Sequence, residues 1–401
     1  MPALEYALRE VENRHPALRS IFPDDEDGIQ YVLQPGHVSL ERVSSPDPRS
    51  AAMTWLSRPF SLESTPSFRV AIIAGTCDSQ FLCFALHHIV CDQHSWKIIN
   101  REISLAYRQY RSGRRSARPG EDGYIRALRR ESAAPREIAR PDPARPGLVT
   151  GLRLPGLRSP RQRGSGLASV TVPQSLVSRM TAYGASLRAT LSVVLLSVCG
   201  LLAGQLTGED LITFTVPVST REPEDEDTVG CFVNLAIMRL NVDPRLPAAK
   251  VVVSARDQMR AALNERMTPF QDVVAGLRSC GAILGRDLPR MASFNLLNVE
   301  AGDELDLDGV TVAEERDTFL ALRNDLSFAA SQSGNTVSLT IRYDTSAVAG
   351  AAVEALAASV PVLGERLIRN PRLRGQQLVA GSPLEAAGIA VMGGVAFTNR
   401  A

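Results

Sequence analysis

Strand-like and helix-like segments alternate along this chain of 401 residues, and this alternation limits the fold more than any other feature. Runs such as Phe68–Ala74 and Leu211–Val218 are short and rich in β-branched or aromatic residues, as strands are. Between such runs, apolar residues recur every three or four positions, as they do at Ile99, Ile103 and Ala106. We therefore expect a mixed α and β fold in which helices cover sheets.

Composition and charge exclude several classes of protein. Hydrophobic residues make up 44% of the chain and charged residues 22%, which is typical of a globular protein. The 44 basic and 43 acidic residues nearly balance, so we expect no nucleic-acid partner. The most apolar run, residues 191–204, is shorter than the roughly 20 residues that span a bilayer. It is expected to be a buried core helix, and we expect no membrane partner.

The six cysteines predict neither a disulfide framework nor a zinc site. They form no CxxC pair and no metal-type spacing with histidine, so we expect reduced thiols, no bound metal and a cytoplasmic location. The amino-terminal residues are amphipathic, unlike a secretion signal. Cys91 is a candidate nucleophile, but a small buried apolar residue is the simpler interpretation.

A stretch rich in arginine, proline and glycine, residues 111–165, predicts a linker or an exposed excursion. We place the domain boundary inside it, between an amino-terminal lobe of residues 1–150 and a carboxy-terminal lobe of residues 151–401. The stretch holds 14 arginines and five acidic residues. It is either a solvated basic linker or a patch that helps to dock an acidic partner.

The residues of clearest chemical meaning are His87, His88 and Asp92, in the run HHIVCD. This run follows a predicted strand, Phe81–Leu86, and precedes a helix for which Ser95 is the expected N-cap. An imidazole with an unperturbed pKa of about 6.5 can take a proton from an amine or a hydroxyl at cellular pH, and His88 is the candidate. Asp92 either fixes the ring or its loop, or pairs with an arginine elsewhere. No third cluster of ligands suggests a metal.

The run HHIVCDQHSW resembles the HHxxxDG signature of nonribosomal peptide synthetase condensation domains, which are chloramphenicol-acetyltransferase-like acyltransferases. RHPALRSIF, residues 14–22, resembles the family's RHxxLRTxF. VPVSTREPEDEDTVGCFVNLAIMRL, residues 216–240, resembles the family's arginine, acidic loop and IGxFVNTxxLR block. The resemblance covers roughly residues 4–371, and the order of several motifs makes it specific.

The resemblance implies an α/β fold of two chloramphenicol-acetyltransferase-like lobes that form a V-shaped pseudo-dimer around a tunnel. It implies transfer of an acyl group from a carrier-protein thioester to an amine, which forms an amide bond. The partner would be an acyl or peptidyl carrier protein, and its phosphopantetheine arm would bring the thioester, so the chain itself would bind no cofactor. The acceptor would be a small amine or an alcohol.

The resemblance also implies roles for individual residues. His88 matches the second histidine of the motif and would position or deprotonate the nucleophile. Asp92 would act structurally by pairing with Arg221, and His87 would pack and hydrogen-bond. Asn295 and Asn298, on a strand that would line the tunnel, are either substrate contacts or polar residues of a sheet edge.

The sequence departs from the family at two places. Gln93 stands where the family has a glycine, so a side chain lies near the reacting group and becomes a candidate substrate contact. The family's first block, S-x-A-Q-x-R, is absent, and no adenylation or carrier signature follows, so we expect a stand-alone or excised unit.

Three functions stay open. The first, which we expect, is amide-forming condensation. The second is an O-acyltransferase that forms an ester from a carrier-bound or coenzyme A-bound acyl group. The third is a non-catalytic module that docks carrier proteins. The presence of both histidines and Asp92 favours the two catalytic functions.

Overall fold

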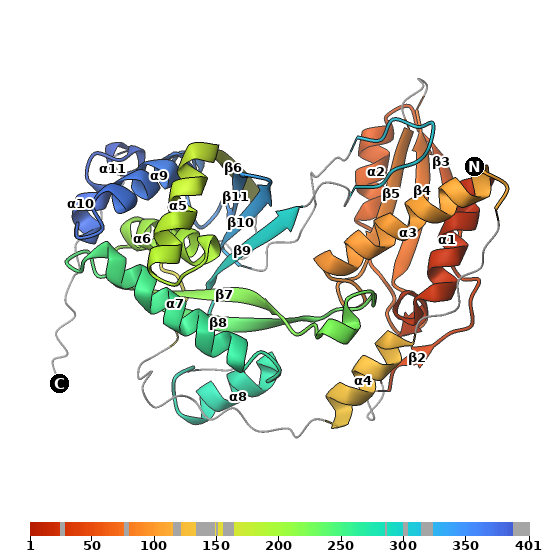
Figure 1. Ribbon diagram of the computed structural model, residues 1–401, viewed down its shortest axis with the longest axis horizontal. Coiled ribbons are helices and arrows are strands. Elements are labelled where there is room, and N and C mark those ends of the chain that lie inside the picture. Colours follow the sequence, from red (N-terminus) through yellow and green to blue (C-terminus); the bar gives the residue numbers. More distant parts are fainter. Residues whose placement is uncertain are drawn as a thin grey trace. The chain divides into compact units, whose positions relative to one another are not determined.

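Two compact units make up the chain (Figure 1). The computed structural model describes residues 1–24, 29–75, 80–114, 122–133, 149, 151–154, 164–284, 287–299, 304–313 and 324–387. Unit 1 consists of Met1–Pro135, Thr220–Val233 and Ala301–Ala321, and unit 2 of Arg136–Ser219, Asn234–Glu300 and Leu322–Ala401. Two later stretches of chain therefore pack with the first unit, where the sequence predicted two continuous lobes. The predicted boundary falls at residue 150, outside the described residues.

Unit 1 places a three-stranded sheet between helices (Figure 1). Its elements are α1 (Pro2–Arg14), η1 (Pro16–Arg19), β1 (Ser20–Ile21), β2 (Tyr31–Val32), β3 (Leu40–Ser44), α2 (Pro48–Leu56), β4 (Phe68–Ala74), β5 (Gln80–Leu86), α3 (Gln93–Arg111), α4 (Gly123–Ala133) and η2 (Pro223–Asp225). Strand β4 is parallel to β3 and antiparallel to β5. It is the central strand of the three, and its side chains alternate between the two faces of the sheet.

The helices of unit 1 cover both faces of this sheet. Val70 of β4 joins α1 and α3 in one apolar cluster, which includes the fully buried Ile99 of α3. Ala71 and Ile73, which alternate with Val70, join a second cluster around Trp55 of α2. Strand β4 is thus buried on both faces, which fixes the end of the neighbouring β5 from which the histidine pair follows.

Helix α4 corrects the prediction that residues 111–165 are only a linker. Its residues Tyr124 and Ala127 are buried, and Ile125 and Leu128 pack against the same cluster as α1 and α3. This spacing of three and four residues is the signal of an amphipathic helix, and the many arginines around it obscured that signal. A role of this basic stretch in docking stays a prediction.

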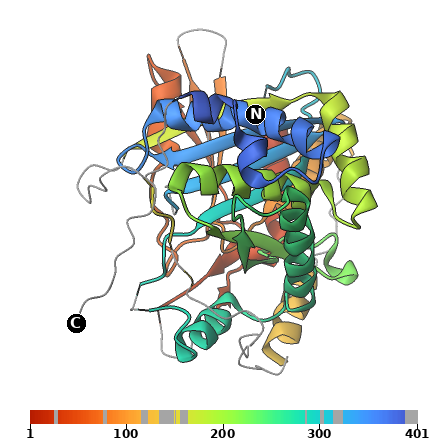
Figure 2. The ribbon, with the colours of Figure 1, turned by 90° about the vertical axis from the view of Figure 1, so that its left-hand side faces the viewer.

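Unit 2 is a six-stranded sheet in the order β6-β11-β10-β9-β7-β8 with helices packed against it. Its elements are β6 (Ser165–Val172), α5 (Gln174–Ser186), α6 (Leu191–Thr207), β7 (Leu211–Ser219), β8 (Val233–Asn241), α7 (Ala248–Asn264), α8 (Phe270–Ser279), β9 (Ala292–Val299), β10 (Leu326–Ser333), β11 (Thr336–Asp344), α9 (Gly350–Arg369), α10 (Gly375–Val379) and α11 (Pro383–Ala386). Strand β9 is parallel to β7 and β10, and β11 is antiparallel to β10 and β6. Figure 2 looks onto the helical layer of this unit, with strands behind it.

Helix α6 is the buried core helix that the sequence predicted. Thr190 caps its first turn by accepting a hydrogen bond from the Val193 amide, and Gly208 ends it with a left-handed φ of 71°. Gly204 lets the helix approach the sheet, because a Cβ at this position would lie 2.6 Å from Cγ2 of Val242. No single helix in the described part of the chain is long and apolar enough to cross a membrane; α5 and α6 meet that criterion only together, across a bend of 101°.

Candidate active site

The two histidines occupy the turn that follows β5 in unit 1. His88 is exposed, and its Nδ1 lies 3.6 Å from Sγ of Cys231. His87 is half-buried, and its Nδ1 accepts a hydrogen bond from the backbone amide of Ile89 at 3.1 Å. The His87 ring also meets Phe60 edge-on, with ring centroids 6.0 Å apart. His87 therefore shapes the turn, and the turn presents His88 to solvent.

Asp92 is the N-cap of α3, where the sequence had predicted Ser95. Its Oδ1 accepts a hydrogen bond from the Ser95 amide at 2.7 Å, so the helix begins at Gln93 and its cap lies three residues earlier than expected. A carboxylate is well placed there, because it binds unpaired amides and favours the positive end of the helix dipole. Gln93 is exposed and helical, so this position does not need the conformational freedom of a glycine. A substrate contact by Gln93 stays a prediction.

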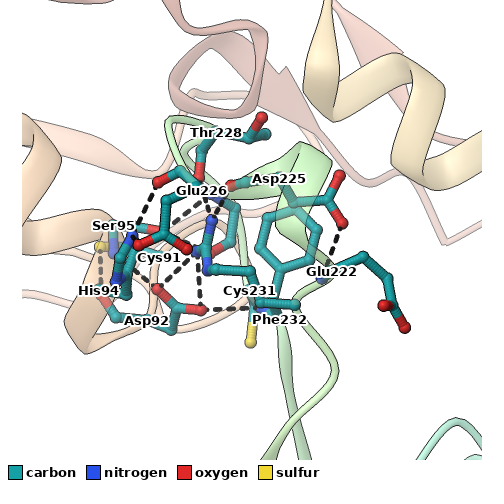
Figure 3. A network of polar contacts seen from close by, with 12 residues as sticks. Cys91, Asp92, His94, Ser95, Glu222, Asp225, Glu226, Thr228, Cys231 and Phe232 are labelled. Atoms are coloured by element: carbon teal, nitrogen blue, oxygen red, sulfur yellow. Dashed lines mark hydrogen bonds and ion pairs between the residues drawn. The ribbon is translucent and has the colours of Figure 1, made fainter.

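A buried ion pair joins Asp92 to Arg221, the arginine with which the resemblance had paired it. The Nη2 atom of Arg221 donates to Oδ2 and Oδ1 of Asp92 at 3.1 Å and 3.2 Å. The Arg221 side chain is only 6% exposed and that of Asp92 only 4%. The amide of Phe232 also donates to Oδ2 of Asp92, at 3.0 Å (Figure 3). Both partners are thus held in place by more than one contact.

Arg221 is fixed on its other side as well. Its Nη1 donates to the backbone oxygen of Thr228 at 2.7 Å and to that of Asp225. Its guanidinium lies 4.2 Å from the centroid of the Phe232 ring, as in a cation–π contact. Arg221 therefore contacts other residues of the segment 220–233 and links that segment to the amino-terminal end of α3.

Asp92 is an anion that serves structure in this arrangement. Burial raises the pKa of its carboxyl, but the charge of Arg221 and the hydrogen bonds from Ser95 and Phe232 outweigh burial and lower the pKa below its ordinary value. In the described part of the chain the carboxylate makes no hydrogen bond to His88. Of the two alternatives for Asp92, the structure therefore shows pairing with an arginine.

Ser95 has a part in the site that the sequence did not reveal. Its hydroxyl donates to the Gly230 oxygen at 2.7 Å and accepts from the Gly230 amide at 3.0 Å. It also accepts from Nη2 of Arg221 at 3.2 Å. The motif D-x-x-S could have indicated a cap at Asp92, but no local signal could have found Gly230, which lies 135 residues away. This hydroxyl is a further link between α3 and residues 220–233, beside the pair of Asp92 and Arg221.

Cys91, which follows the histidine pair, is a partly buried thiol, and it bears on the question of a nucleophile. Burial and then the charge of Asp92 raise the pKa of Cys91, and its Sγ donates to the backbone oxygen of Asp92 at 3.3 Å. The packing interpretation of Cys91 is therefore favoured over a nucleophile. All the cysteines within the described residues are free thiols. The same residues contain no group of three or more metal-ligating side chains.

The two asparagines lie in unit 2, on β9, and point to opposite faces of the sheet. Side chains alternate along a strand, and three positions separate Asn295 from Asn298. Asn298 is on the face of Phe294, which is fully buried in the core cluster of unit 2. Asn295 shares the other face with Ser293, whose hydroxyl donates to Ser327. One strand cannot present both amides to a single surface, so at most one of them fits the predicted wall.

Comparison with known proteins gives a family from the sequence and a matching fold from the structure. A family model described as Condensation domain matches residues 1–389. The chain is similar to cyclosporin synthetase simA of Tolypocladium inflatum, with 27% identity over 336 residues, which is 77% of this chain and 2% of that protein. The chain thus spans a small fraction of this relative.

Solved structures show the same fold. The X-domain from teicoplanin biosynthesis matches with a TM-score of 0.72 and 20% identity over 93% of this chain and 88% of that one. The first condensation domain of the calcium-dependent antibiotic synthetase, in complex with a substrate analogue, matches with a TM-score of 0.67 and 17% identity over 94% and 90%. The mixed α and β fold is therefore confirmed as the fold of these domains. The V-shaped arrangement of lobes and the tunnel stay predictions.

Proposed function

The chain belongs to the condensation-domain family, and from this premise we propose that it transfers an acyl group from a carrier-protein thioester to an amine. The amine nitrogen attacks the thioester carbonyl, a carbon–nitrogen bond forms, and the carbon–sulfur bond breaks. The products are an amide and the free phosphopantetheine thiol of the carrier protein. Nonribosomal peptide or related natural-product biosynthesis is the setting that this reaction implies.

The presentation of His88 supports this proposal most directly. The ring is exposed, and within the described residues its Nε2 has no hydrogen-bond partner. In the proposed reaction this nitrogen takes the proton of the attacking amine and returns it to the departing thiol. General-base catalysis of this kind contributes about 10²- to 10⁴-fold to a rate. An exposed imidazole on a fixed turn suits a reaction in which both substrates arrive from solution.

The other predicted residues have supporting roles in this proposal. Asp92, ionised and paired with Arg221, anchors the loop and does not take a proton. His87 shapes the turn through the Ile89 amide. Gln93 and one of the two β9 asparagines remain candidates for contact with substrate.

Two alternatives compete with amide formation. An O-acyltransferase would use the same imidazole on an alcohol and yield an ester. A docking module would use the fold without the reaction. The similarity to the X-domain, which is also known in a complex with OxyB, is the observation that supports this alternative. The exposed His88 favours catalysis, because a docking module has no need of a free imidazole there.

A single-turnover assay distinguishes these functions. A peptidyl carrier protein loaded with a panel of aminoacyl groups is mixed with the chain and a pool of amines and alcohols, and mass spectrometry identifies the products. We expect an amide, and we expect His88→Ala to reduce its formation by at least about 100-fold. His37→Ala, which removes another exposed histidine of unit 1, is the matched control and keeps full activity. Undiminished product with His88→Ala would overturn the role of His88, and ester alone would indicate the O-acyltransferase.

A further inference from the structure

Cys231 is a polar side chain in contact with the exposed ring of His88. Its Sγ lies 3.6 Å from Nδ1, across 143 residues of sequence. This separation is within hydrogen-bonding range for sulfur, which forms longer hydrogen bonds than oxygen because of its size. Both residues are exposed and both belong to unit 1. The thiol and the imidazole therefore meet at the solvent-exposed surface of unit 1.

The position of Cys231 is fixed on both sides along the chain. Before it, the amide and the oxygen of Gly230 are both bound by the Ser95 hydroxyl. After it, the amide of Phe232 donates to Asp92 (Figure 3). The Phe232 oxygen in turn accepts from the Thr220 amide at 2.9 Å. The Asp92 amide also donates to the Gly230 oxygen, at 3.2 Å. Five hydrogen bonds thus hold the two neighbours of Cys231, and they fix the backbone from which the thiol reaches the ring.

We propose that Cys231 is a positioning residue for His88, with the Nδ1–H group of the ring donating to the Cys231 sulfur. This inference rests on the proposed function. A neutral imidazole carries its proton on one nitrogen only. A proton held on Nδ1 leaves the lone pair on Nε2, the nitrogen that has no partner within the described residues. Cys231 thereby selects the tautomer that can accept a proton from the nucleophile, in the way that a ring's second partner sets which nitrogen is protonated.

The proposal assigns a second use to the ion pair of the site. Asp92 and Arg221 hold residues 220–233 in place, and within that stretch the Cys231 thiol meets the His88 ring. The motif aspartate then acts on its histidine indirectly, through a chain of contacts that ends in a thiol. On this proposal, a change at Asp92 alters catalysis without a direct contact between Asp92 and the ring.

Two variants separate positioning from other roles. Cys231→Ala removes the acceptor, and Cys231→Ser replaces it with an oxygen that can also accept from Nδ1–H. Cys280→Ala, which removes another exposed cysteine that lies in unit 2, is the matched control. With the carrier assay, we expect kcat to fall roughly fivefold in Cys231→Ala, which corresponds to loss of one hydrogen bond. We expect KM to stay unchanged and Cys231→Ser to recover most of kcat.

A measurement without turnover tests the tautomer itself. In protein labelled with 15N-histidine, long-range proton–nitrogen correlation spectra show which ring nitrogen of His88 carries the proton, and His88→Ala assigns the signal. We expect Nδ1–H in the unmodified chain and in Cys231→Ser, and a shift toward Nε2–H in Cys231→Ala. If His88→Ala keeps full activity, the proposed function fails, and these spectra still decide whether Cys231 sets the tautomer.

Two results would overturn the proposal. One is a Cys231→Ala variant with the same spectrum and the same kcat as the unmodified chain. The other is an acyl adduct on Cys231 after incubation with the loaded carrier, together with a Cys231→Ser variant as inactive as Cys231→Ala. That combination would assign Cys231 as a nucleophile.

Discussion

Replacing Asp92 with asparagine tests the central interaction of the site, the buried pair with Arg221. Asparagine keeps the shape of the side chain and an oxygen for the Ser95 amide, but it removes the negative charge. Arg221, 6% exposed, is then a buried cation without its counter-ion. Breaking a buried pair by removing one partner costs about 3 to 5 kcal/mol. At the lower end of that range, and at about 2 to 4 °C per kcal/mol, the melting temperature falls by roughly 6 to 12 °C.

The matched control is Asp227→Asn. Asp227 and Arg101 also form an aspartate–arginine pair of unit 1, at 2.6 Å, but their side chains are 68% and 59% exposed. Exposed pairs contribute about 0 to 1 kcal/mol, so this variant should melt within about 4 °C of the unmodified chain. Differential scanning fluorimetry measures both. Equal shifts for Asp92→Asn and Asp227→Asn would refute the argument from burial.

A double variant adds a second check on the same pair. Arg221→Gln together with Asp92→Asn removes both charges, so neither side chain is left as an isolated buried ion. We expect the loss in free energy of unfolding of the double variant to be roughly 1 to 3 kcal/mol smaller than the sum of the losses of the two single variants, as for residues in direct contact. Strict additivity would mean that the two side chains do not interact.

Three further predictions concern pH and packing. The pKa of Asp92 is lowered in the folded chain, so the stability advantage over Asp92→Asn is full above about pH 4 and shrinks as the pH falls below that value; an unchanged advantage in urea unfolding at about pH 2.5 would contradict the shift. Ser95→Ala leaves the Gly230 amide without the Ser95 hydroxyl and leaves the Gly230 oxygen with the Asp92 amide, so urea unfolding should show a loss of about 1 to 3 kcal/mol, whereas no loss would mean that water replaces the hydroxyl. Gly204→Ala gains about 1 kcal/mol of helix propensity but places a Cβ against Val242, and overpacking of this kind costs about 1 to 3 kcal/mol. We therefore expect a small net loss of stability, and a rise in melting temperature would show that α6 has room to shift.

Local sequence patterns predicted the helices and strands whose bounds depend on nearby residues alone. Strand β4 has the bounds predicted from its apolar run, and α6 begins after Thr190 because the Thr190 hydroxyl caps a largely apolar helix. Helix α4 was missed because its buried positions, such as Tyr124 and Ala127, lie among arginines that dominate the composition. Composition over a long window therefore concealed a short-range pattern that was present.

The candidate site was predictable in part. The strand-end histidines and the choice of Arg221 as partner came from motifs, and the structure places Asp92 and Arg221 together. The contacts of Ser95 with Gly230 and of Cys231 with His88 span more than 130 residues, and no periodicity reports on pairs so far apart. The opposite facing of the β9 asparagines, in contrast, follows from the two-residue repeat of a strand and could have been read from their spacing.

The discontinuous make-up of unit 1 has a consequence for protein engineering. A chimera joined at residue 150 would inherit the histidine turn from one parent and Arg221 from the other. The anion and the cation of the buried pair would then come from sequences that never evolved together, and so would the glycine and the serine that bridge them. Residues 220–233 and α3 should therefore be taken from the same parent whenever such domains are recombined. During synthesis, too, the ribosome must add about 130 residues after Asp92 before its counter-ion exists, so the nascent histidine turn lacks this ion pair until the whole first segment of unit 2, Arg136–Ser219, has been made.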